Sequence, residues 1–134
     1  MPARQMTVCF SGYRPEKLPW GSDESDPRCA LLKQRLRRAV CDACADGYRH
    51  FICGMARGAD TYCAEIVLAL RQQYPDITLE AAIPCPSQSD AWLPEEQARW
   101  RSMVERCDFE TVVQDRYGPG CMQRRNRYMV DHAS

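Results

Sequence analysis

The stretch HFICGMARGAD, residues 50–60, combines an apolar run with two glycines and an acidic residue. This pattern predicts a strand that runs through a tight turn into a helix. Gly54 and Gly58 allow the backbone a positive φ or a close approach to a bound group, and free amides at a helix start favour an anion. Arg57 offers a counter-charge. The predicted phosphate or carboxylate site comprises Gly54, Met55, Ala56, Arg57, Gly58, Ala59 and Asp60.

The turn CGMARGAD matches neither the dinucleotide fingerprint G-x-G-x-x-G nor the phosphate loop G-x-x-x-x-G-K-[ST]. It therefore indicates the kind of group that binds, and it does not indicate a reaction. Asp60 has two interpretations that the sequence leaves open. Its carboxylate either caps the free amides of its own helix or accepts hydrogen bonds from the ribose hydroxyls of a ligand.

Other polar and aromatic residues follow the neighbouring predicted strands. Arg14 comes after Gly12 and Tyr13, where it can meet an anion or a stacked base, although a loop arginine is more often only solvated. Gln88 and Trp92 lie in a later loop and can hydrogen-bond to and stack against a base. The segment RRNR, residues 124–127, adds three positive charges at the start of the last predicted helix. We favour phosphate binding by at least one of these residues over an exposed basic face.

The cysteines and histidines do not form a pattern typical of metal binding or nucleophilic catalysis. The chain has nine cysteines, an odd number, at positions inside predicted strands and helices, which predicts reduced thiols that act as small hydrophobic side chains. Cys41 and Cys44 form a C-x-x-C without a second pair or a nearby histidine. We therefore predict no metal site and no cofactor. His50 and His132 stand apart from any cysteine or serine arrangement, so structural roles are favoured for both.

Composition places the chain among ordinary globular proteins. Its 134 residues suit one domain, and 18 basic residues balance 18 acidic ones, so overall charge does not draw it to nucleic acid or membrane. No apolar run approaches the length of a signal peptide or of a membrane span of roughly 18 residues. We expect a cytoplasmic protein without a membrane partner.

Strand and helix patterns alternate along the chain. Strands are predicted at 6–10, 51–53, 77–83 and 109–113, and helices begin at Pro27, Ala59, Pro94 and Met122, the second reaching Tyr74. The last helix is predicted to bury Met122, Met129, Val130 and Ala133. This alternation implies a parallel sheet with right-handed crossovers and helices on both faces. Ligands bind such sheets at the carboxyl ends of the strands, where every loop here is long or contains glycine.

Four segments together resemble the YpsA-like branch of the SLOG superfamily of Rossmann-like domains: FSGYRP, FICGMARGADTYCAE, the loop with Gln88 and Trp92, and MQRRNRYMV. The similarity extends from about Met6 to the end of the chain. GMARGAD is also similar to the SGxARGID stretch of the DNA-processing protein DprA, and RRNR is similar to the PRRNR segment of that family. The arginines before Tyr128 are placed like those of the LOG phosphoribohydrolases.

The resemblance implies one α/β domain over residues 1–134, Rossmann-like and three-layered, with a mainly parallel sheet of at least four strands flanked by helices. It also implies binding of a nucleotide or nucleotide-derived small molecule, in sensing or regulation. By motif, the contacts fall on Gly12, Tyr13 and Arg14, on Gly54 to Asp60, and on Arg124 and Asn126. LOG and DprA relatives self-associate, so the resemblance implies a homodimer as well.

One departure from the family pattern bears on catalysis. LOG enzymes carry a later G-G-x-G-T-x-x-E segment with a catalytic glutamate, and YpsA-like chains usually add a strand and a glycine-rich turn, but neither follows MVDHA here. Asp60 and Glu65 are the remaining acids, so we expect binding without catalysis and assign no catalytic residue. A nucleotide N-glycosidase or phosphoribohydrolase is the alternative. A DprA-like module for single-stranded DNA is a further alternative, disfavoured by the zero net charge.

Overall fold

A single parallel sheet forms the centre of the molecule. The computed structural model describes residues 4–133. Its four strands are β1 (Thr7–Phe10), β2 (His50–Cys53), β3 (Thr78–Ile83) and β4 (Phe109–Val112), and they lie side by side in the order β1-β2-β3-β4. All three pairings are parallel, with Cys9 opposite Ile52 and Cys53 opposite Ala81. The carboxyl ends of the strands therefore share one edge of the sheet.

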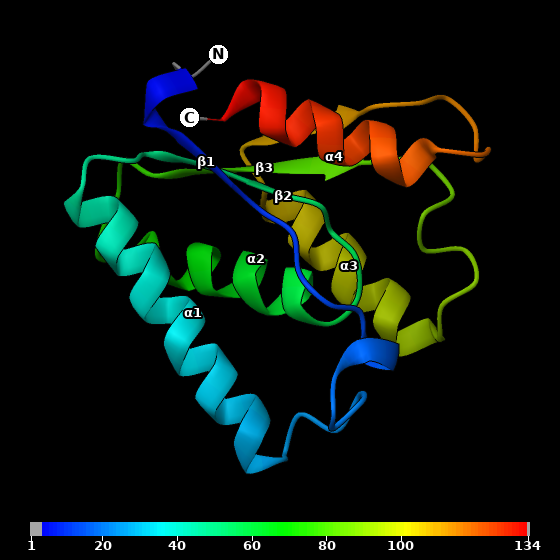
Figure 1. Ribbon diagram of the computed structural model, residues 1–134, viewed down its shortest axis with the longest axis horizontal. Coiled ribbons are helices and arrows are strands. Elements are labelled where there is room, and N and C mark those ends of the chain that lie inside the picture. Colours follow the sequence, from blue (N-terminus) through cyan, green and yellow to red (C-terminus); the bar gives the residue numbers. More distant parts are fainter. Residues whose placement is uncertain (1–3, 134) are drawn as a thin grey trace.

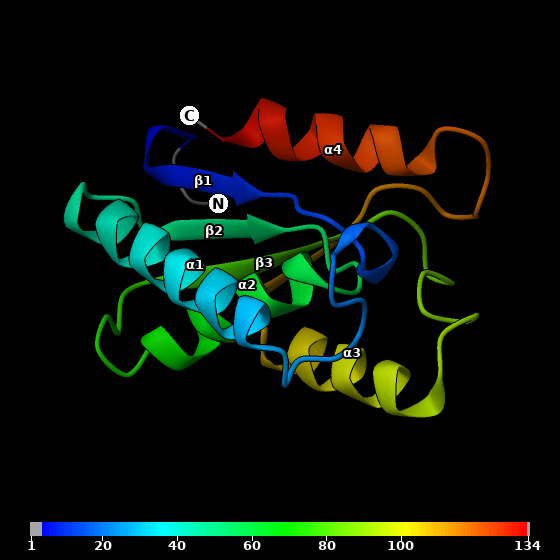
Figure 2. The ribbon, with the colours of Figure 1, turned by 60° about the horizontal axis from the view of Figure 1, so that its bottom comes forward.

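Helices cover both faces of this sheet, as the sequence predicts. The α-helices are α1 (Pro27–Ala45), α2 (Ala59–Leu70), α3 (Pro94–Arg106) and α4 (Cys121–His132), with short 3-10 turns η1 (Arg4–Met6) and η2 (Pro15–Lys17). Figure 1 and Figure 2 show α1, α2 and α3 on one face and α4 alone on the other. Right-handed crossovers that all advance in one direction place their helices on the same face. The α/β, Rossmann-like three-layer fold is thus confirmed.

Local sequence explains where the helices begin and end. Asp26 caps α1 by accepting a hydrogen bond from the Arg28 amide at 2.8 Å, and Pro27 occupies the first helical position. The predicted extent of α2 is wrong by about one turn, because the helix ends at Leu70 and not at Tyr74. Residues 71–73 form a turn, since a proline at position 75 disfavours helical backbone in the residue before it.

The main core lies between the sheet and the three helices on one face. Its buried side chains include Phe51, Leu79, Ile83, Val67 and Met103. On the other face, Met129 of α4 packs on Ile52 and Ala82. The predicted inner face of α4 is correct for Met129 and Ala133, whereas Val130 is 62% exposed and Met122 is only partly buried. Arg125 is buried in their place.

A buried polar cluster joins α4 to the sheet. His50 lies with Nε2 2.7 Å from Glu80 Oε1 and Nδ1 2.6 Å from Thr78 Oγ1. The other Glu80 oxygen accepts hydrogen bonds from Thr111 and Tyr128. His50 is therefore structural, as expected. No helix among residues 4–133 is long and apolar enough to cross a membrane.

Candidate functional site

Three segments from the carboxyl edge of the sheet meet around a hollow of about 200 Å³. They are the loop after β1, the turn after β2 and the first turns of α4. The hollow is lined by Ser11, Gly12, Arg14, Ala56, Asp60, Met122, Arg125 and Asn126, and we call it the arginine hollow. Five of these residues, namely Gly12, Arg14, Ala56, Asp60 and Asn126, belong to the site predicted from the sequence.

Asp60 joins two of the segments from its position in the first turn of α2. Its carboxylate accepts hydrogen bonds from the Gly12 amide at 2.8 Å and from the Ala56 amide at 3.2 Å. Burial raises the pKa of this carboxyl group, while the two amides and the Arg125 charge oppose that rise. Asp60 thus bridges the β1 loop to the β2 turn, and the amides that it binds precede α2.

Arg125 brings a positive charge to the same place from α4. Its guanidinium donates to the Gly54 carbonyl at 2.5 Å through Nη1 and to Asn126 Oδ1 at 2.8 Å through Nε. Burial lowers the pKa of Arg125, the Asp60 carboxylate raises it, and the nearby Arg14 charge lowers it again. Arg14 lines the same hollow, so both positive charges border one space. Arg14 itself is exposed.

Close packing accounts for the glycines around the hollow. A Cβ atom on Gly12 would lie 2.7 Å from the Ala59 Cβ, and one on Gly54 would lie 2.6 Å from Arg125 Nη1. Gly58 has a φ of +85°, and a Cβ there would lie 2.6 Å from the Tyr13 carbonyl oxygen. The Ala59 amide donates to that same oxygen at 3.0 Å. The three glycines therefore allow close contact between the β1 loop, the β2 turn and α4, the three segments that surround the arginine hollow.

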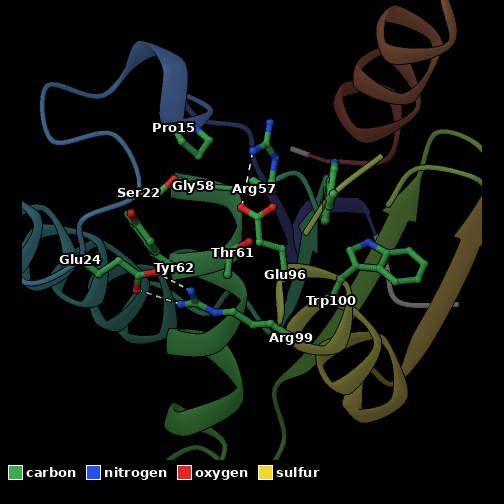
Figure 3. Close-up of a pocket in the computed structure, with 11 residues that line it drawn as sticks. Pro15, Ser22, Glu24, Arg57, Gly58, Thr61, Tyr62, Glu96, Arg99 and Trp100 are labelled. Atoms are coloured by element: carbon green, nitrogen blue, oxygen red, sulfur yellow. Dashed lines mark hydrogen bonds and ion pairs between the residues drawn. The ribbon is translucent and has the colours of Figure 1, made fainter. Parts of the chain in front are cut away.

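A second hollow of about 50 Å³ lies between the β1 loop, α2 and α3, and we call it the tryptophan hollow (Figure 3). It is lined by Pro15, Ser22, Glu24, Arg57, Gly58, Thr61, Tyr62, Trp92, Glu96, Arg99 and Trp100. Arg57 pairs with Glu16 at 2.7 Å and with Glu96 at 3.5 Å, and its guanidinium lies over the Trp92 ring. The predicted counter-charge therefore points into the tryptophan hollow and is already paired with carboxylates.

The remaining predicted residues lie around these hollows. Gln88 is buried and donates to the Gly54 carbonyl at 3.1 Å, while it accepts from the Trp100 indole at 3.2 Å. Met55 is fully buried with a φ of +61°, a strained conformation for this residue type. Arg124 is exposed and donates to Gln114 Oε1 at 2.6 Å.

Arg125 lines the arginine hollow, but the motif-based site left it out in favour of its neighbours Arg124 and Asn126. The buried residues of α4 are Cys121, Arg125 and Met129, which are four residues apart. This helical spacing is the sequence signal that could have identified Arg125 as a residue facing the sheet.

Within residues 4–133, no group of three or more His, Cys, Asp or Glu side chains is placed to hold a metal ion, and the nine cysteines are free thiols.

Comparison of the sequence with known proteins identifies the family of this chain. The YpsA family model, described as the YspA SLOG family, matches residues 8–134. The chain belongs to the YpsA family. It is similar to the UPF0398 protein of Lactobacillus acidophilus, at 31% identity over 91% of this chain and 66% of the relative. UPF0398 proteins of Staphylococcus saprophyticus and Leuconostoc citreum are 26% and 25% identical over 95% and 92% of this chain. The chain spans about two thirds of the length of these relatives.

Substitution of Gly58 tests whether close packing requires glycine in the turn after β2. Gly58→Ala is expected to lower the free energy of unfolding by about 1–2 kcal/mol for the positive φ and by about 1–3 kcal/mol more for the clash with Tyr13. The matched control is Gly21→Ala, because Gly21 also has a positive φ but has open space around it. Urea denaturation measures both. Equal losses in the two variants would contradict the packing argument.

Glu24, in the loop after β1, forms ion pairs with residues of α1 and α3, and its substitution tests how much these pairs stabilise the protein. Its carboxylate pairs with Arg99 and Lys33, and the Arg99 hydrogen bond, aided by Lys33, lowers its pKa from 4.5 to about 2. Because the folded pKa is lowered, this stability is present above pH 4.5 and is lost as the pH falls toward 2. Glu24→Gln is expected to cost about 1–2 kcal/mol at pH 6, a figure reduced for solvent screening.

Urea denaturation at pH 6, 4 and 2.5 gives the difference between wild type and Glu24→Gln at each pH. We expect this difference to shrink steadily toward zero as the pH falls. Glu105→Gln is the control, because Glu105 is exposed on α3 and in no salt bridge among the described residues. A difference that stays constant across this range would contradict the ionic role of Glu24.

Proposed function

We propose that this YpsA-family protein binds a nucleotide or a nucleotide-derived small molecule, with a phosphate group in the arginine hollow. The observation that carries the proposal is the charge balance of that hollow. Arg14 and Arg125 both line it, together with one carboxylate, Asp60, whose two oxygens already accept backbone hydrogen bonds. The hollow therefore has an excess of positive charge, which an anion between the two guanidinium groups would neutralise.

The start of α4 supports an anion at the same position. Met122 and Arg125, from its first two turns, line the hollow. Gly120 precedes the helix in a left-handed conformation, and no side chain caps the amides that follow. The positive end of the helix dipole thus adds to the two arginine charges. A guanidinium group can also donate two parallel hydrogen bonds to two phosphate oxygens, which the ammonium group of a lysine does not do.

We propose sensing or regulation, and not hydrolysis, as the use of this binding. The two acids considered for an N-glycosidase are both engaged: Asp60 with backbone amides, and Glu65 with Arg99 at 2.6 and 2.9 Å. Burial raises the pKa of Asp60, but both of its oxygens already accept backbone hydrogen bonds, so we do not assign it the role of a general acid or base. A DNA-binding groove has less support, because Trp92 and Trp100 lie beside the carboxylates of the tryptophan hollow and the chain has no net positive charge.

The binding proposal is tested by a thermal-shift screen of nucleotides, ADP-ribose and cyclic dinucleotides, followed by titration calorimetry with the most stabilising compound. Arg14→Ala is expected to weaken its binding about 10- to 100-fold, the size of one or two charge-assisted hydrogen bonds. Arg127→Ala removes an equal charge from the exposed face of α4 and is expected to change binding less than threefold. A screen in which no phosphate-bearing compound stabilises wild type would refute the proposal.

We also propose that the protein acts as a homodimer in the cytoplasm. The supporting feature is β1, which is an edge strand of the sheet. Beside it, Val8, Phe10, Leu36 and Ala39 line an apolar hollow of about 110 Å³. A second chain that covered this edge would bury apolar surface and pair open backbone groups. Light scattering is expected to give twice the 15.4 kDa chain mass, and a single species of 15.4 kDa at all concentrations would contradict the dimer.

A further inference from the structure

A third hollow adjoins the arginine hollow and differs from it in chemistry. It is an open depression with a volume of about 520 Å³ between the loop after β1 and the first half of α1. Its lining residues are Phe10, Ser11, Gly12, Tyr13, Leu18, Trp20, Leu32, Leu36 and Ala59, and we call it the large apolar hollow. Ser11 and Gly12 line both this hollow and the arginine hollow. The two hollows therefore lie on either side of a shared wall at the end of β1.

The large apolar hollow offers apolar contact and few hydrogen-bonding side chains. Most of its lining is aliphatic or aromatic, and its side chains with polar atoms are Ser11, Tyr13 and Trp20. The Trp20 indole nitrogen is directed at the Tyr62 hydroxyl, 3.4 Å away. A nucleobase in this space would thus stack against aromatic and aliphatic side chains, which accept any base. It would meet few side chains that could hydrogen-bond to the polar atoms on its edge.

Tyr13 lines the large apolar hollow and directly follows Gly12, which lines both hollows. Its backbone is fixed, because its carbonyl oxygen accepts from the Ala59 amide and lies against Gly58. Its side chain is 68% exposed and makes no hydrogen bond to another described residue. An aromatic ring exposed to this extent on a fixed backbone can close over a ligand and bury apolar surface when it does so.

We propose that the two hollows form one ligand site, in which the arginine hollow holds the phosphate and the large apolar hollow holds the base. This inference rests on the proposed function and adds the orientation and the ligand class. The base is bound by ring contact with Tyr13 and by apolar side chains, so the site selects a nucleoside phosphate without distinguishing adenine from guanine. Together the hollows fall within the size range of small-molecule sites, roughly 300–1,000 Å³.

Titration calorimetry with AMP, GMP, ribose 5-phosphate and hexyl phosphate tests this inference. We expect AMP and GMP to bind within about threefold of each other. Ribose 5-phosphate and hexyl phosphate are expected to bind about tenfold more weakly or worse, because neither has a flat aromatic ring that can stack. Tyr13→Ala is expected to weaken AMP and GMP about tenfold while it leaves ribose 5-phosphate unchanged. Tyr117→Ala removes a similarly exposed tyrosine outside the hollows and is the matched control.

The possible outcomes separate the inference from the function on which it rests. Ribose 5-phosphate or hexyl phosphate binding as tightly as AMP would overturn the base site and leave the phosphate site standing. A difference of tenfold or more between AMP and GMP would overturn recognition by stacking alone, as would a Tyr13→Ala variant that binds AMP like wild type. Binding of no nucleotide in either the screen or the titrations would remove the proposed function, and this inference with it.

Discussion

The site depends on one buried carboxylate. Asp60 is 1% exposed and accepts hydrogen bonds from amides of two separate segments, the β1 loop and the β2 turn. Arg125 then ties the same turn to α4 through the Gly54 carbonyl. Removing one partner from such a buried set leaves an uncompensated charge, which is far more costly than losing an exposed ion pair. The relative position of three chain segments is therefore fixed by these few contacts.

This arrangement explains why positive charge remains available at the surface. The Asp60 carboxylate is committed to backbone amides and partly offsets buried Arg125, whereas Arg14 lies on the exposed loop. The tryptophan hollow has the opposite character, because Arg57 and Arg99 are each paired with two carboxylates. The arginine hollow is thus the one in which we propose an anion, while the ion pairs of the tryptophan hollow join the β1 loop to α2 and α3. Bound groups gain affinity from such preorganisation, because less ordering is needed on binding.

The sequence was sufficient for the fold, which follows from periodicity, and it predicted that the loops at the shared edge of the parallel strands lie together. It was insufficient for the direction of individual side chains. Arg57 lies in the predicted turn, but it turns toward carboxylates contributed by the β1 loop and α3, and those partners depend on tertiary packing. The RRNR motif did not show that Arg125 is the buried member, because that follows from which face of α4 meets the sheet. The large apolar hollow depends on the path of a long loop, which has no periodic pattern to predict it.

We propose that a nucleotide occupies the arginine hollow and the large apolar hollow beside it. The most direct test of this claim is an NMR titration of ¹⁵N-labelled protein with AMP, in which the Gly12 amide and the indole groups of Trp20, Trp92 and Trp100 report on different hollows. We predict that the signals of the Gly12 amide and the Trp20 indole shift, while those of the Trp92 and Trp100 indoles do not change. Shifts confined to Trp92 and Trp100 would place the ligand in the tryptophan hollow and contradict the claim.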